Sequence, residues 1–194
     1  MPRRCPLTGS IPATRCVQCG STACSHAALF ACVCSSVTAI RDGTFLRCSS
    51  LASVALPPGL RSIGDSAFGG CTALAAIGLP ATLATIGDDA FFGCASLSAV
   101  SLPAGVGQIG IQTFAGCTAL AEVLVPDGVS AVGDAAFAGC VMLREIYLPS
   151  SVRVVGRGAF AGCPELVVRI GNPVASYGKG AFDGCGSVSA EVRL

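Results

Sequence analysis

The sequence predicts a repeat solenoid built mainly from β-strands, with about seven coils and a parallel sheet along one side. Seven cysteines recur at steps of 23 residues, apart from a last step of 22: Cys48, Cys71, Cys94, Cys117, Cys140, Cys163 and Cys185. An Ala-Phe pair precedes most of them, and Leu, Val or Ile recurs at fixed offsets after them. A fixed period of about 20 to 50 residues is typical of solenoids, in which each unit buries its apolar face only against its neighbours.

The first extended segment of each unit follows its cysteine. After Cys117, Val123 and Val125 lie two residues apart, and Pro126 comes next. Residues two apart share one face of a strand, and proline cannot donate to a strand ladder, so we expect a short strand that ends at the proline. The equivalent pairs are Val54 and Leu56, Ile77 and Leu79, Val100 and Leu102, and Ile146 and Leu148.

A second apolar pair and a glycine complete the strand pattern. Val129 and Val132 are followed by Gly133, and the other units repeat this arrangement. The pattern predicts a second short extended segment, and then a turn that needs the permissive backbone of glycine.

The segment before each cysteine is predicted to be one helical or 3₁₀ turn. Asp65, Asp88 and Asp134 follow the glycine, where a carboxylate suits the cap of such a turn. Seven phenylalanines at the same repeat position are expected to stack as a column inside the coil: Phe45, Phe68, Phe91, Phe114, Phe137, Phe160 and Phe182.

The two ends of the array depart from the consensus. Val37, Ile40 and Phe45 align with the second coil after a shift of 23, so the array is expected to begin near residue 28 in degraded form. The short last step is best placed as a deletion between Leu166 and Val168. We therefore divide the chain into a Cys-rich, poorly ordered leader at 1–27 and a solenoid at 28–194.

The composition limits the functions that the chain can have. Hydrophobic residues make up 52% and charged residues 12%, so the surface is weakly solvated, and we expect a protein partner or self-association through uncapped solenoid ends. A net charge of +1 with no basic run argues against nucleic-acid binding, and no apolar stretch is long enough for a membrane span. The basic N-terminus lacks the apolar core of a signal peptide, which makes an intracellular location the default.

The repeat resembles the BspA-like, or Treponema-type, leucine-rich repeats. Their pattern, roughly Leu-x-x-Ile-x-Leu-Pro-x-x-Val-x-x-Ile-Gly-x-x-Ala-Phe-x-x-Cys, matches from about residue 33 to 185. The resemblance implies a right-handed leucine-rich-repeat superhelix that binds proteins, often in surface or adhesion proteins of bacteria and protists. It also implies no shared catalytic residues, and it raises the cell surface as a location.

The recurring cysteines have three interpretations. Equivalent atoms of adjacent coils lie about 4.8 Å apart, but parallel side chains present a poor dihedral angle for a disulfide, and one straight column cannot surround a metal ion. We expect a ladder of reduced, packed thiols that donate weakly to carbonyl groups.

The leader carries a candidate zinc site. Cys16 and Cys19 form a Cys-x-x-Cys pair that supplies half of a tetrahedral site, and Cys24 or His26 could complete it. The rival to a binding scaffold is therefore a small zinc-binding protein. A loosely ordered leader without metal is the plainer interpretation, so the prediction for the whole chain is no cofactor.

Catalysis has little support in the sequence. His26 is the single histidine, which removes most Ser-His-Asp and Cys-His mechanisms. Asp65 and Asp88 would lie side by side in adjacent coils. A role in capping turns explains the two residues better than an acid/base pair does. We predict that the chain is not an enzyme, and the alternative is the recognition segment of a longer enzyme.

The outward positions of the main strands supply the functional clue. In the first coils they are small, as at Ala55, Gly78 and Ser101, whereas later coils place charged and aromatic side chains there. Tyrosine and arginine are enriched in binding hot spots. We therefore predict that a partner binds the later part of this face, at Glu122, Leu124, Glu145, Tyr147 and Arg169.

Overall fold

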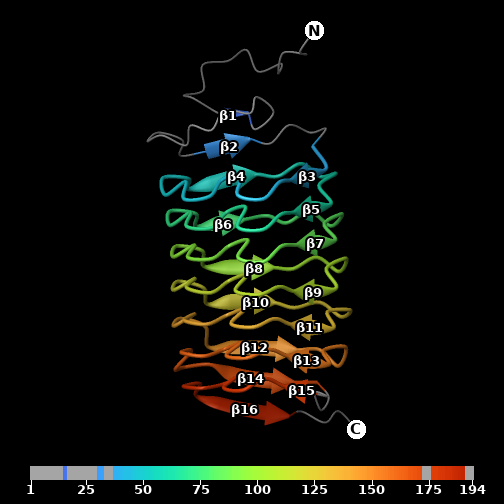
Figure 1. Ribbon diagram of the computed structural model, residues 1–194, viewed down its shortest axis with the longest axis vertical. Helices are drawn as coiled ribbons and strands as arrows, with labels where there is room; N and C mark the ends of the chain where they lie inside the picture. Colours follow the sequence, from blue (N-terminus) through green and yellow to red (C-terminus); the bar gives the residue numbers. More distant parts are fainter. Residues whose placement is uncertain (1–14, 17–29, 33–36, 172–175, 191–194) are drawn as a thin grey trace.

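The computed structural model describes residues 15–16, 30–32, 37–171 and 176–190. Over these ranges the chain forms a parallel β-solenoid whose coils stack along the long axis of the molecule (Figure 1). Each coil contributes one strand to a main sheet and one to a second sheet, and the two columns of strands run side by side along the stack. The predicted fold class is confirmed, with about six turns of the coil.

The main sheet contains the strands that follow each cysteine. Its pairs are parallel and fall into three ladders, β1-β2-β4-β6, β8-β10 and β12-β14-β16. The bounds are β1 (Arg15–Cys16), β2 (Phe30–Cys32), β4 (Ser53–Ala55), β6 (Ala76–Ile77), β8 (Ala99–Ser101), β10 (Glu122–Leu124), β12 (Glu145–Leu148), β14 (Val167–Ile170) and β16 (Ser187–Ala190).

The second sheet contains the short segments that precede the glycine found at the same position of most repeats. It consists of two parallel ladders, β3-β5-β7 and β9-β11-β13-β15. The bounds are β3 (Ala39–Ile40), β5 (Ser62–Ile63), β7 (Thr85–Ile86), β9 (Gln108–Ile109), β11 (Ala131–Val132), β13 (Val154–Val155) and β15 (Ser176–Tyr177). Both extended segments predicted from the apolar spacing are therefore present.

The register between coils follows the 23-residue period and its one deletion. Ile40 pairs with Ile63, so the first coil aligns with the second coil as predicted. Ile146 pairs with Val168, a step of 22, which confirms that the missing residue lies between Leu166 and Val168. The predicted leader at 1–27 lies outside the described residues, apart from β1.

The phenylalanine column forms the centre of the core. All seven rings stack, with centroids 5.0 to 5.7 Å apart and interplanar angles of 11° or less. The five central rings are completely buried. Ring stacking adds to the hydrophobic gain of burying each side chain, so the column is a continuous apolar spine.

The segment before each cysteine is not helical, contrary to the sequence prediction. Within the described ranges no residue is in an α- or 3₁₀-helix. Ser66 and Gly70 have φ angles of 52° and 72°, which interrupt a right-handed helix. The amides of Ser66, Phe68 and Gly70 instead donate to carbonyl oxygens of the next coil, at 2.8, 2.8 and 2.6 Å. The amides of Ala67, Gly69 and Cys71 donate to carbonyl oxygens three residues back in their own coil, so bonds between coils alternate with local turn bonds.

The backbone donor that each aspartate binds also differs from the prediction. The Oδ1 atom of Asp65 accepts the backbone N–H of Asp88, one coil further on, at 2.9 Å, and Asp88 accepts the N–H of Ile111 at 2.7 Å. The carboxylates satisfy a backbone donor as expected, but the donor belongs to the adjacent coil and not to a helical turn of their own.

The glycine after each second strand is required for space and not for its φ angle. Gly87 does not have a positive φ. A β-carbon on Gly87 would collide with the backbone and carboxylate of Asp65, and one on Gly133 would lie 2.6 Å from the carbonyl carbon of Gly110. The glycine column therefore lets neighbouring coils approach closely at the point where the aspartates bond across them.

Candidate binding face

The outward side chains of the main sheet form the candidate face. The strands alternate between exposed and buried residues, as in β12, where Glu145 and Tyr147 are exposed and Ile146 and Leu148 are buried. Because equivalent strands lie one above another along the stack, the outward residues form two rows along the sheet. One row contains Glu122 and Glu145 and continues to Val167, and the other contains Leu124, Tyr147 and Arg169.

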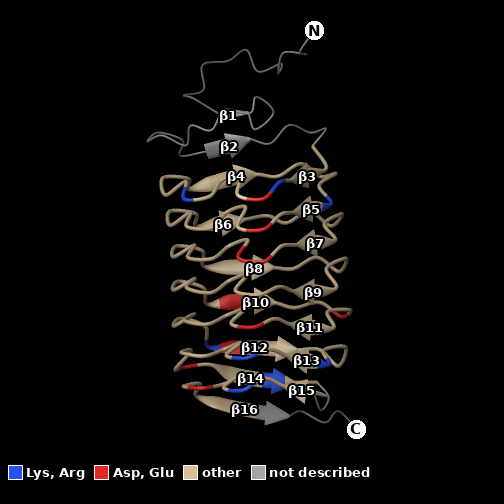
Figure 2. Cartoon of the chain, in the orientation of Figure 1, with Lys and Arg blue, Asp and Glu red and all other residues tan. Residues whose placement is uncertain are grey.

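The five predicted partner-binding residues lie together on three successive coils. Glu122 and Leu124 are on β10, Glu145 and Tyr147 on β12, and Arg169 on β14. All five are exposed. Figure 2 shows that charge is absent from β4, β6 and β8 and appears at β10, β12 and β14. The face is therefore flat and uncharged in its first coils and chemically varied in its later ones.

An ion pair joins two of the coils. The Nε atom of Arg169 lies 2.7 Å from Oε1 of Glu145, although Arg169 is directly opposite Tyr147 in the register. The pair therefore runs diagonally across the strands. Both side chains are about half exposed, so the pair contributes at most about 1 kcal/mol to stability. Its main consequence is to hold the guanidinium beside the carboxylate of Glu145.

Glu122 has no such partner. Among the residues that the structure describes, the Arg169–Glu145 pair is the one ion pair formed. The carboxylate of Glu122 is therefore a free negative charge on the exposed face, one coil before the neutralised Glu145.

A glycine that was not predicted to belong to the face, Gly171, lies close to Tyr147. A β-carbon on Gly171 would collide with the Tyr147 hydroxyl group and would lie 3.1 Å from Cζ. Gly171 does not have a positive φ, so a lack of space beside Tyr147 and the backbone amide of Ser150 favours a residue without a side chain there. Gly171 follows β14 directly and lies two residues after Arg169, so its sequence position already indicates that it is close to the face.

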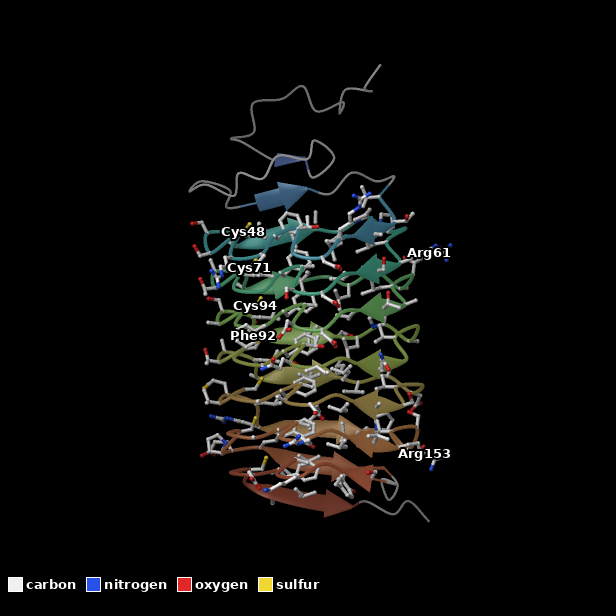
Figure 3. The ribbon with its side chains drawn as sticks, in the orientation of Figure 1. Cys48, Arg61, Cys71, Phe92, Cys94 and Arg153 are labelled. Atoms are coloured by element: carbon white, nitrogen blue, oxygen red, sulfur yellow. The ribbon has the colours of Figure 1, made fainter. Side chains whose placement is uncertain are left out.

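Six cysteines of the ladder are unreactive, hydrogen-bonded thiols. Cys71, Cys94, Cys117, Cys140, Cys163 and Cys185 are free thiols, and each Sγ donates to a phenylalanine carbonyl oxygen of the preceding coil at 3.2 Å. Figure 3 shows Cys48, Cys71 and Cys94 one above another. Burial raises the pKa of Cys71 to about 12 and that of Cys163 to about 11. Such thiols form little thiolate, so they pack and do not react.

Cys48 differs from the rest of the ladder. It is disulfide-bonded, and its partner is not one of the other six cysteines of the column, which are free. The expectation of a fully reduced ladder therefore fails at its first member and holds for the six that follow.

The acidic residues of the turns bind the backbone of the adjacent coil. Asp65 and Asp88 each use a carboxylate oxygen to accept a backbone N–H. Partial burial, and then the charges of Asp88 and Asp65, raise the pKa of Asp89. Asp89 has a φ of 55°, so its position belongs to the strained turn and not to a cleft.

The candidate zinc ligands Cys16, Cys19, Cys24 and His26 lie outside the residues whose side chains are described. Within the described ranges, no three His, Cys, Asp or Glu side chains come together in a way that could hold a metal ion. No helix long and apolar enough to cross a bilayer occurs in the described part of the chain.

Comparison with known proteins agrees with the repeat. The family model for the BspA type leucine rich repeat region matches residues 38–167, in 6 copies. No curated protein gives a significant match.

Three solved structures share the fold. A leucine-rich repeat protein from T. pallidum is 36% identical with a TM-score of 0.77, and the match covers 82% of this chain and 77% of that one. One from Bacteroides ovatus is 32% identical with a TM-score of 0.76, covering 81% of this chain and 41% of that one. One from Eubacterium ventriosum is 23% identical with a TM-score of 0.73, covering 85% and 45%. The chain thus spans less than half the length of the last two.

Proposed function

Because the chain belongs to the BspA-type leucine-rich repeat family, we propose that it is a non-enzymatic scaffold for protein–protein binding, with a role in surface recognition or adhesion. The family supports the general class of interaction scaffold, since a solenoid presents a long continuous surface. We propose that the binding face is formed by Glu122, Leu124, Glu145, Tyr147 and Arg169.

One observation carries the location of this face. The outward rows of the main sheet change from small, uncharged residues in β4, β6 and β8 to large and charged ones in β10, β12 and β14. Exposed Ala, Gly and Ser offer little area to bury, whereas Tyr147 has an apolar ring and a hydroxyl group, and 38% of it is exposed. A partner gains most by binding the later coils.

The test is a matched pair of variants. Once a partner is isolated, its dissociation constant is measured by calorimetry for Tyr147→Ala, and for Gln108→Ala as the control on the second sheet, where Gln108 is exposed. Loss of a hot spot costs about 2 kcal/mol or more, close to thirtyfold in affinity, so Tyr147→Ala should weaken binding and Gln108→Ala should not. Equal, negligible effects would reject this face.

For the location, we propose the cell surface. Cys48 is disulfide-bonded, and disulfides persist mainly in oxidising compartments. The intracellular default expected from the sequence would leave this cysteine reduced. Alkylation of thiols in intact cells, followed by mass spectrometry of the peptide that contains Cys48, distinguishes the two: an alkylated Cys48 would contradict the surface location.

Self-association is a second candidate, favoured by the last described coil. Tyr177 is 48% exposed and Val188 45% exposed, whereas the equivalent residues of earlier coils, such as Val155 and Val168, are completely buried. The edge of a sheet that ends in apolar residues is a site where another chain can pair. Sedimentation of the wild type and of Val188→Lys tests this: a dimer that Val188→Lys fails to dissociate would argue against this end.

A further inference from the structure

We propose that the face formed by Glu122, Leu124 and Tyr147 receives an extended segment of the partner in which a basic side chain and an apolar side chain lie two residues apart. This inference rests on the proposed binding function and adds the chemistry of the partner. It follows from three features of the face: an unpaired carboxylate, an exposed apolar pair, and a tyrosine whose hydroxyl group occupies space that Gly171 leaves open.

The charge on the face favours a basic partner. Glu145 is already neutralised by Arg169 at 2.7 Å, which also leaves Arg169 without the free charge that an acidic partner would need. Glu122 forms no ion pair with any other described residue. Among the outward residues of β10, β12 and β14 the remaining unbalanced charge is therefore negative, and a Lys or Arg side chain complements it.

The apolar part of the site lies beside this carboxylate. Leu124 is 56% exposed, the largest exposed fraction among the large hydrophobic residues described. The repeat spacing of 23 places Tyr147 next to Leu124 in the adjacent coil, and Figure 1 shows β10 and β12 as neighbours. Together the two side chains form an apolar surface large enough to cover one aliphatic or aromatic side chain of a partner.

The orientation of the Tyr147 ring depends on the space that Gly171 leaves open. Its hydroxyl end lies over Gly171, where a β-carbon would collide with it. The hydroxyl end of the ring therefore lies beside Gly171, and Arg169 is paired with Glu145. A side chain held in its binding position loses less entropy on association, so Gly171 is a positioning residue for this site.

The spacing of the face determines the spacing in the partner. Glu122 and Leu124 are two residues apart on one parallel strand, which corresponds to about 6.6 Å. An extended peptide also presents every second side chain on one side at this interval. A partner strand running along β10 therefore places its basic residue over Glu122 and its apolar residue over Leu124 and Tyr147, as Lys/Arg-x-apolar or its reverse.

The experiment uses a random library of 12-residue peptides displayed on phage, selected on the whole chain. We expect selected peptides to be enriched in a Lys or Arg two residues from an apolar residue. Synthetic peptides of this class should lose about thirtyfold in affinity on Leu124→Ala, the loss expected for a hot spot. Glu122→Gln should weaken them about twofold to fivefold in low salt, because an exposed charge pair contributes little, and should have no effect in 1 M salt.

A double-mutant cycle tests the role of Gly171. Gly171→Ala alone should weaken peptide binding without changing the melting temperature, and should have no further effect in a Tyr147→Ala background, because its action passes through the tyrosine. A Gly171→Ala variant that binds normally, or one whose effect simply adds to that of Tyr147→Ala, overturns this part.

The other possible outcomes distinguish failure of this inference from failure of the proposed binding function. Enrichment of acidic peptides, or of binders unaffected by both Leu124→Ala and Glu122→Gln, overturns the inference but leaves the chain a protein-binding scaffold with a different site. Failure to select any binder overturns the inference. Only failure of the native partner to bind the solenoid as well would reject the proposed function.

Discussion

Phe91 and Phe92 are adjacent in sequence but differ completely in burial, which allows a matched test of the phenylalanine column. Phe91 is fully buried, and its ring lies 5.3 Å from that of Phe68 and 5.4 Å from that of Phe114. Phe92 is 45% exposed, and Figure 3 shows it on the flank of the solenoid. Replacing each by alanine removes the same atoms from two different environments.

Phe91→Ala should destabilise the solenoid by about 3–5 kcal/mol, the usual loss for a buried phenylalanine, because it removes two stacked contacts and leaves a cavity between rings that cannot close. For a chain of this size each kcal/mol corresponds to about 2–4 °C, so the melting temperature should fall by about 6–20 °C. Phe92→Ala removes a side chain that is only half buried and should cost about 1 kcal/mol or less.

Circular dichroism measures both variants during thermal and urea unfolding. Each coil of a solenoid contacts only its neighbours, so Phe91→Ala is also expected to broaden the transition by uncoupling the coils on either side. Equal changes for Phe91→Ala and Phe92→Ala, or a Phe91→Ala variant that melts like the wild type, would show that the stacked rings are not the core.

Further predictions concern the turns and the cysteines. Ala135 has a φ of 52° where another coil has Gly158, so Ala135→Gly should raise the melting temperature and Gly158→Ala should lower it. Each change in the free energy of unfolding should be about 1–2 kcal/mol, and substitutions with the opposite signs would contradict the assigned turn. Gly87→Ala should destabilise strongly in urea titrations, because its β-carbon would meet Asp65. The pKa of Cys71 is raised from 9.0 to about 12, so the neutral thiol stabilises the fold fully below pH 9 and this stability is lost as the pH rises from 9 toward 12; melting temperatures that stay constant over this alkaline range would argue against buried thiols. At pH 8 the six free thiols of the column should react with Ellman's reagent only after denaturation.

Much of the architecture could be predicted because a strict period converts sequence position into spatial position. The stacking of Phe68 on Phe91 and the deletion after Leu166 both follow from counting residues. The outward direction of Glu145 and Tyr147 follows from strand alternation. These features could be predicted because residues at the same repeat position occupy equivalent places in successive coils.

The contacts that sequence reasoning missed depend on the path of the backbone between strands. Serine at position 66 gives no sign of a left-handed φ, so the turn was predicted to be helical. The hydrogen bond from Asp88 to the carboxylate of Asp65 joins two coils, and the period does not show which coil supplies the donor. The contact between Gly171 and Tyr147 likewise depends on how one side chain leans, and alternation says nothing about that.

The central claim is that every coil stacks directly on the next in register, which makes the outward rows one continuous face. A distance between spin labels introduced at positions 39 and 154 measures this directly, since both residues are exposed on the second sheet and occupy the same repeat position. Encoded labels avoid the native cysteines. Five steps of about 4.8 Å predict a narrow distribution near about 24 Å. A broad distribution, or one centred beyond about 35 Å, would contradict the stacked solenoid.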